Sequence, residues 1–90
     1  MMYPYITLGD ETMIAHSELR TDSKGNYIEV MFDKPLEAGG FKTARARLPE
    51  YIWLSNEGFS QSDLDFFKEF LEHNSHTLFK YAQCGGIQIA

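Results

Sequence analysis

The sequence has little of several features that mark well-known classes of protein. It contains one cysteine, Cys84, which excludes an internal disulfide and a zinc site built from cysteines alone. It contains no run of about 18 apolar residues, and its first residues lack both the charged and the apolar part of a signal peptide. We therefore expect a cytoplasmic protein that does not cross a membrane.

Basic residues are also scarce. Eight Lys and Arg face 13 Asp and Glu, which gives a formal net charge of −5 at pH 7 with neutral histidines. A generic nucleic-acid binder needs a dense basic surface to neutralise phosphates, so this balance disfavours that class. Hydrophobic residues make up 43% of the chain and aromatic residues 14%, which is too many for a disordered segment. A chain of this size buries one modest core, which predicts a single folded domain over residues 1–90.

The first half of the sequence has the pattern of an antiparallel meander. Short segments of β-forming residues alternate with turn signals such as Gly9-Asp10 and Lys24-Gly25-Asn26. The largely apolar segment 50–58, which follows Pro49, favours no particular form. We predict four strands: Tyr3–Leu8, Thr12–Arg20, Tyr27–Phe32 and Phe41–Leu48.

Side chains on a strand alternate between two faces, which sorts the residues of each predicted strand. The third strand places on its core face Ile28, Val30 and Phe32. The fourth places there two small side chains, which let a helix approach closely, and one large one: Ala44, Ala46 and Leu48. For the second strand we expect on the core face Met13, Ala15, Ser17 and Leu19, and on the outward face Ile14, His16, Glu18 and Arg20.

The second half of the sequence predicts helix. Ser60 is a suitable N-cap, with Asp63 three residues later as its capping-box partner. Phe59 before the cap can pack on Leu64 and fix the direction of entry. Apolar residues then recur at helical spacing: Leu64, Phe67 and Leu71.

The polar run His73-Asn74-Ser75 interrupts this apolar series. It predicts a break near Asn74, after which Ser75 caps a second helix that stops at Gly85-Gly86. The last residues, 87–90, alternate like a short edge strand. Together these segments predict an α+β domain, in which a four-stranded antiparallel meander is followed by two consecutive helices packed on one sheet face.

The outward sheet face carries the best candidates for binding. The predicted alternation gathers seven side chains there: His16, Glu18, Arg20, Tyr27, Glu29, Arg45 and Arg47. One interpretation is a solvated face of cross-strand ion pairs, each worth roughly 0.2–1 kcal/mol. The other is a binding face, in which Arg45 and Arg47 grip carboxylates or a phosphate while Tyr27 and Met31 supply apolar contact.

Aromatic residues of the predicted helices exceed what one sheet face needs. The stripe of Leu64, Phe67 and Leu71 suffices to cover that face, which leaves three side chains for another surface: Phe66, Phe70 and Phe79. Either these complete the core, or they form an interface with a second copy or a small protein partner.

The sequence predicts no catalytic, cofactor or metal site. His73 and His76 are three residues apart, yet nothing in the spacing places Cys84 or His16 beside them as a third zinc ligand. Nucleophile-elbow, phosphate-loop and zinc-protease motifs are absent, which makes an enzyme the least favoured class. We interpret the chain as a non-enzymatic interaction module that binds itself or a small protein partner. The alternative is a nucleic-acid-associated protein that uses the Arg, His and Tyr side chains of the sheet face.

Overall fold

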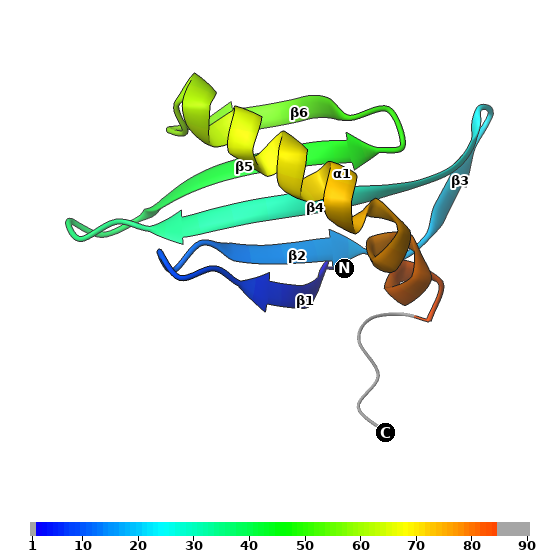
Figure 1. Ribbon diagram of the computed structural model, residues 1–90, viewed down its shortest axis with the longest axis horizontal. Helices are drawn as coiled ribbons and strands as arrows, with labels where there is room; N and C mark the ends of the chain where they lie inside the picture. The colour runs from blue at the N-terminus through cyan, green and yellow to red at the C-terminus, as the bar shows by residue number, and fades with distance from the viewer. Residues whose placement is uncertain (1, 85–90) are drawn as a thin grey trace.

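The computed structural model describes residues 2–84, which form an antiparallel sheet with one helix laid across it (Figure 1). Helix α1 (Gln61–Gln83) follows the last strand and lies over one sheet face. The short strand β3 (Arg20–Asp22) pairs only with the first residues of β4. The other strands lie side by side in this order: β1 (Met2–Thr7), β2 (Met13–Ser17), β4 (Gly25–Pro35), β5 (Phe41–Leu48) and β6 (Ile52–Glu57).

This architecture confirms the predicted α+β class and antiparallel sheet but not the predicted number of elements. The described residues form six strands and one helix. The predicted second strand is divided, because Met13–Ser17 pairs with β1 and β4, whereas Arg20–Asp22 pairs with the start of β4. The predicted C-terminal edge strand lies outside the described residues.

The unassigned segment 50–58 contains the whole of β6, the strand at one edge of the sheet. Arg45 pairs with Ser55 and its neighbour Ala46 pairs with Trp53, so Leu54 is an extra residue in β6. Such a bulge interrupts the alternation of side chains between the two faces. This is why the period of two was not visible in this part of the sequence.

The predicted break at Asn74 is wrong, because α1 runs through it without interruption. The Asn74 side chain donates a hydrogen bond from Nδ2 to the carbonyl of Phe70, one turn earlier, at 2.9 Å. Its Oδ1 accepts a hydrogen bond of 2.9 Å from the hydroxyl of Tyr5 on β1. A polar residue that disfavours helix in isolation is therefore satisfied inside the helix by contacts with its own turn and with the sheet.

The start of α1 matches the prediction. Ser60 is the N-cap, its hydroxyl accepts from the backbone of Asp63, and the Asp63 carboxylate accepts from the backbone of Ser60. Phe59 and Leu64, on either side of the cap, both belong to the buried core. The reciprocal bonds satisfy two backbone donors that the first turn of a helix otherwise leaves unpaired.

The core lies between α1 and the central strands β4 and β5. Phe32 of β4 stacks on Phe67 of α1 with ring centroids 4.3 Å apart and planes inclined by 14°. The alternation predicted for these two strands is confirmed, because the buried residues of both strands face the helix: Ile28, Val30, Phe32, Ala44, Ala46 and Leu48. The two alanines leave room for this close approach of helix and sheet.

The face predicted for β2 is wrong from Met13 to His16, although Ser17 is buried and Leu19 packs against the core as expected. Ile14 and His16 are buried with 1% and 0% of their surface exposed, whereas Met13 is 42% exposed. Ile14 pairs with Phe32 and His16 with Val30, so these side chains share the face that carries α1. Alternation sorts the residues of β2 into two sets, but both sets contain apolar and polar members. The choice between the sets therefore had to come from the neighbouring strands.

We predict that Tyr5→Phe destabilises the domain, because it removes the hydroxyl that ties β1 to Asn74 of α1. A net contribution of about 1 kcal/mol is expected for one such bond, which lowers Tm by roughly 4–8 °C in a domain of this size. The measurement is thermal and urea unfolding. Tyr3→Phe is the matched control. Tyr3 also lies on β1 with its ring beside that of His16, and its hydroxyl has no hydrogen bond among the described residues. Equal stability of the two variants contradicts the prediction.

Candidate functional site

The sheet face turned away from α1, here called the open face, is covered by no other element in residues 2–84 (Figure 1). Antiparallel register arranges its side chains in rows across the strands. The middle row runs through Pro4, Ala15, Met31, Arg45 and Ser55. This row is apolar on β1, β2 and β4 and becomes charged on β5, so the open face is divided into an apolar and a charged part.

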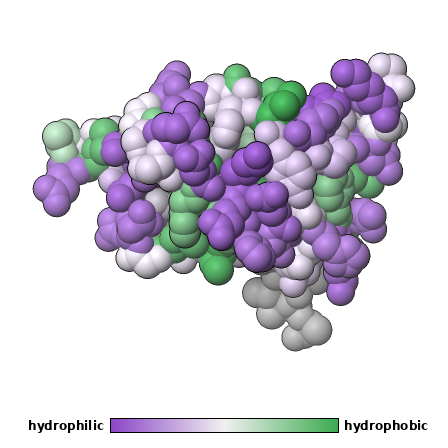
Figure 2. Space-filling model, turned by 45° about the horizontal axis from the view of Figure 1, so that its top comes forward, coloured by the Kyte–Doolittle hydropathy of each residue, from purple (hydrophilic) through white to green (hydrophobic). Residues whose placement is uncertain are grey.

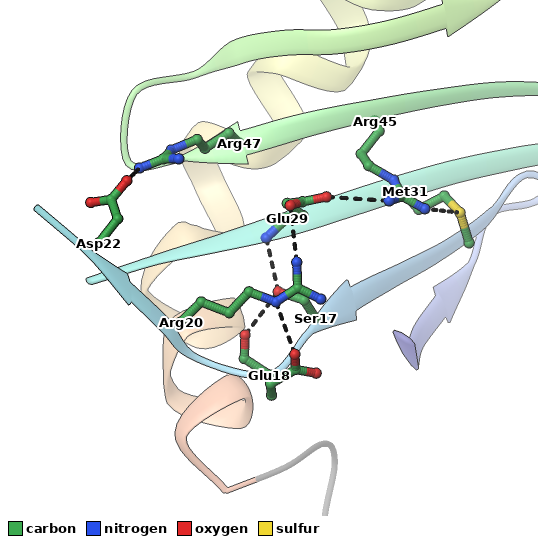
Figure 3. Close-up of polar contacts among 8 residues, drawn as sticks. All are labelled: Ser17, Glu18, Arg20, Asp22, Glu29, Met31, Arg45 and Arg47. Carbon is green, nitrogen blue, oxygen red and sulfur yellow. Dashed lines mark hydrogen bonds and ion pairs between the residues drawn. The ribbon is translucent and has the colours of Figure 1, made fainter. Parts of the chain in front are cut away.

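The charged part is centred on Glu29 (Figure 3). Its carboxylate accepts from Arg20 at 3.0 Å and from Arg45 at 3.3 Å, and Arg20 also donates to Glu18 at 2.8 Å. The backbone of Glu29 donates to the hydroxyl of Ser17, which fixes the strand beneath the carboxylate. We refer to Glu18, Arg20, Glu29 and Arg45 as the ion-pair cluster.

Arg47 is held separately, beside the β3–β4 hairpin. Its guanidinium donates to Asp22 and, at 3.0 Å, to Glu50. It also lies 3.9 Å from the centre of the Tyr27 ring, the arrangement of a cation–π contact. Arg47 is thus engaged by two carboxylates and an aromatic ring at once.

These contacts perturb the acids of the open face. The hydrogen bond from Arg20 lowers the pKa of Glu18 from its ordinary 4.5 to about 2. The hydrogen bond from Arg47 lowers the pKa of Asp22 in the same way. The same hydrogen bonds raise the pKa of the two arginines, that of Arg20 through Glu18 and that of Arg47 through Asp22. The charged forms of all four groups are stabilised by the fold.

The structure places five of the six residues singled out for binding on the open face in two groups: Glu18, Glu29 and Arg45 in the ion-pair cluster, and Tyr27 with Arg47 beside it. Their arrangement is that of cross-strand ion pairs, the first of the two interpretations. With Arg20, Asp22 and Glu50 included, three arginines face four carboxylates. The charged part of the open face therefore has no excess of positive charge.

His16 is the sixth residue, and the structure places it elsewhere. It is fully buried on the helix side, between the rings of Tyr3 and Tyr5, whose centroids lie 5.8 and 6.3 Å away. Its Nδ1 lies 2.8 Å from the carbonyl oxygen of Ser17, and its Nε2 has no hydrogen-bond partner in the described part of the chain. A ligand on the open face cannot reach this side chain.

The apolar part of the open face contains a hollow of about 430 Å³, here called the apolar groove. The small side chain of Ala15 lies between those of larger neighbours, which leaves this space unfilled. Apolar residues form most of its lining, namely Met2, Pro4, Ile6, Met13, Ala15 and Met31. Arg45 borders it, since one guanidinium nitrogen lies 3.5 Å from the sulfur of Met31. The groove was not predicted, because Met13 and Ala15 were assigned to the core.

The three aromatic residues singled out on the helix have different surroundings. Phe66 is 56% exposed, whereas Phe70 and Phe79 are half-buried and pack against the core. Phe70 contacts the rings of Tyr5 and Phe32 edge to face. On the side of the molecule that Figure 2 shows, hydrophilic residues cover most of the surface and apolar residues form small patches between them. Phe66 is thus the member of this set that remains most available to a partner.

We predict that the domain loses stability as the pH falls below 4.5. Glu18 and Asp22 have lowered pKa values in the folded state, so the unfolded chain takes up protons first. Their contribution is complete above pH 4.5 and is lost as the pH falls toward about 2. The measurement is Tm between pH 7 and pH 3. Asp22→Asn should make the decline of Tm with falling pH less steep. Asp65→Asn, on the exposed helix surface, is the control and should leave the decline unchanged. Equal slopes of Tm against pH for the two variants count against the prediction.

Neither a metal site nor a membrane span is evident in residues 2–84. No three His, Cys, Asp or Glu side chains in that range are arranged to hold a metal ion. Helix α1 is too polar to cross a bilayer. Comparison of the chain with protein-family models, with curated proteins and with solved structures found no match.

Proposed function

We propose that this chain is a protein-interaction module that binds its partner through the open face, with the apolar groove as the principal contact. The supporting observation is the groove itself, an apolar hollow that none of the described elements fills. At its edge Ile6 and Met13 are 48% and 42% exposed. Contiguous exposed apolar surface of this kind is typical of interaction sites.

The surroundings of the groove suit a protein partner. Methionine side chains are flexible and polarisable, so Met2, Met13 and Met31 can adapt to the shape of an inserted side chain. The ion-pair cluster next to Met31 supplies a polar border, as the rim of a protein interface requires. Phe66, on α1 at the opposite side of the sheet, is a separate and smaller exposed apolar contact.

The nucleic-acid alternative has less support. It depended on Arg45, Arg47, His16 and Tyr27 acting together on the open face. Arg47 is engaged by Asp22, Glu50 and the Tyr27 ring, Arg45 by Glu29, and His16 is buried. Binding to phosphates would have to replace these carboxylates, which costs the ion pairs already formed.

We predict that Ala15→Arg abolishes partner binding without unfolding the domain. The new side chain fills the groove and places a charge in it, while the backbone of β2 stays paired on both sides. Gln83→Arg is the matched control, since it adds the same charge at an exposed position near the end of α1. The measurement is quantitative co-purification from source cells with parent, Ala15→Arg and Gln83→Arg chains.

Binding is located by hydrogen exchange of the purified complex. A partner retained by Gln83→Arg, lost by Ala15→Arg and protective of residues 13–15 and 29–33 supports the proposal. A partner that binds Ala15→Arg as well as the parent contradicts it. Circular dichroism confirms that each variant is folded, and Met13→Lys replaces Ala15→Arg if that chain fails to fold, because Met13 is already exposed.

A further inference from the structure

One end of the open face carries two carboxylates that no base of residues 2–84 pairs with. The row next to Ala15 runs from Met13 through Asp33 and Thr43 to Glu57. Asp33 lines the apolar groove, and Glu57 follows two strands further, roughly 10 Å away at the usual strand spacing. Neither carboxylate forms an ion pair within the described residues.

Two of the bases close to this end are already engaged, and a third, Lys42, forms no ion pair within the described residues but alternates to the face that carries α1, where its stem lies beside Gly58. Lys34, one residue from Asp33, pairs with Asp10 at 3.3 Å. Arg45 lies on the next row and pairs with Glu29. The chain as a whole has a formal charge of −5. An approaching partner therefore meets an apolar hollow with the unpaired carboxylate of Asp33 in its lining and that of Glu57 two strands beyond it.

We infer that the occupant of the apolar groove is a basic protein segment, in which an apolar side chain enters the groove and a Lys or Arg reaches Asp33 and Glu57. The inference rests on the proposed function. An extended segment advances about 3.3 Å per residue, so the base stands roughly two to four residues from the apolar anchor. The hollow supplies most of the binding energy and the two carboxylates select the sign of the partner's charge.

The same charges disfavour two other occupants. A second copy would bring its own Asp33 and Glu57 toward those of the first, and each copy has a formal charge of −5. An anionic membrane would be repelled by the same carboxylates. A basic segment is the partner for which apolar and charged contacts act together.

The test begins with a random peptide library displayed on phage and selected on the immobilised parent protein, with Ala15→Arg as the counter-selection. We expect enrichment of peptides that combine Lys or Arg with Leu, Met or Phe and fail to bind Ala15→Arg. The most enriched sequence is then synthesised with a fluorophore, and its Kd is measured by fluorescence polarisation.

The carboxylates are tested by the double variant Asp33→Asn/Glu57→Gln. Loss of two exposed ion pairs should weaken the Kd of the enriched peptide roughly twofold to thirtyfold. Higher salt should weaken the parent complex and have less effect on the variant. Glu69→Gln/Glu72→Gln is the matched control, since it removes two exposed charges from α1 and leaves the open face unchanged.

The outcomes separate this inference from the proposed function. Peptides that need Ala15 but carry no bases, or that bind the two double variants equally, overturn the basic partner and leave the groove as a binding site. A parent dimer that Ala15→Arg converts to a monomer, measured by light scattering, also overturns the basic partner. It leaves the groove as a binding site that a second copy occupies. Failure to enrich any peptide that distinguishes the parent from Ala15→Arg overturns both.

Discussion

The stack of Phe32 on Phe67 is the contact on which the rest of the structure depends. Phe32 lies on β4, the central strand, and Phe67 lies in the first half of α1, so this pair sets how the helix crosses the sheet. The Trp53 ring also contacts Phe32, which joins the edge strand β6 to the same centre. A chain of 90 residues has apolar side chains for about one such layer. The helix covers one face of the sheet, and the opposite face has to be stable without a cover.

The open face meets this requirement in two different ways. Over β4 and β5, carboxylates and guanidinium groups pair across the strands, and their hydrocarbon stems shield the backbone beneath them. Over β1, β2 and β4, methionine, proline and alanine side chains take their place and leave a hollow. The first arrangement is satisfied within the chain. The second arrangement leaves apolar surface exposed to water. A partner that covers this surface releases the water without breaking polar contacts of the protein.

Prediction from the sequence succeeded where one residue pattern had one interpretation. From Ile28 to Phe32 and from Ala44 to Leu48 every second residue is apolar, and apart from Met31 the residues between them are charged, so alternation and core face coincide. At Ser60 the cap depends on residues three apart in the chain, which a sequence shows directly. It failed at Asn74, where the stabilising partner is Tyr5, 69 residues away, and in β6, where a bulge at Leu54 shifts the period. Both failures come from contacts between segments distant in sequence.

The charged part of the candidate site was predicted from the sequence, but the apolar groove was not. The groove was missed because the two faces of β2 were assigned the wrong way round. Glu18, Glu29, Arg45 and Arg47 were expected to form ion pairs because opposite charges recur on strands that alternation brings together. Polarity alone assigns Met13 and Ala15 to the core face of β2 and His16 to its outward face. A histidine is accepted in the core here because Tyr3 and Tyr5 surround its ring and a carbonyl lies within hydrogen-bonding distance of one of its nitrogens. Because side chains alternate along β2, the burial of His16 places Met13 and Ala15 on the open face. His16 was predicted to bind a partner directly. Instead it fixes which side of β2 a partner can reach.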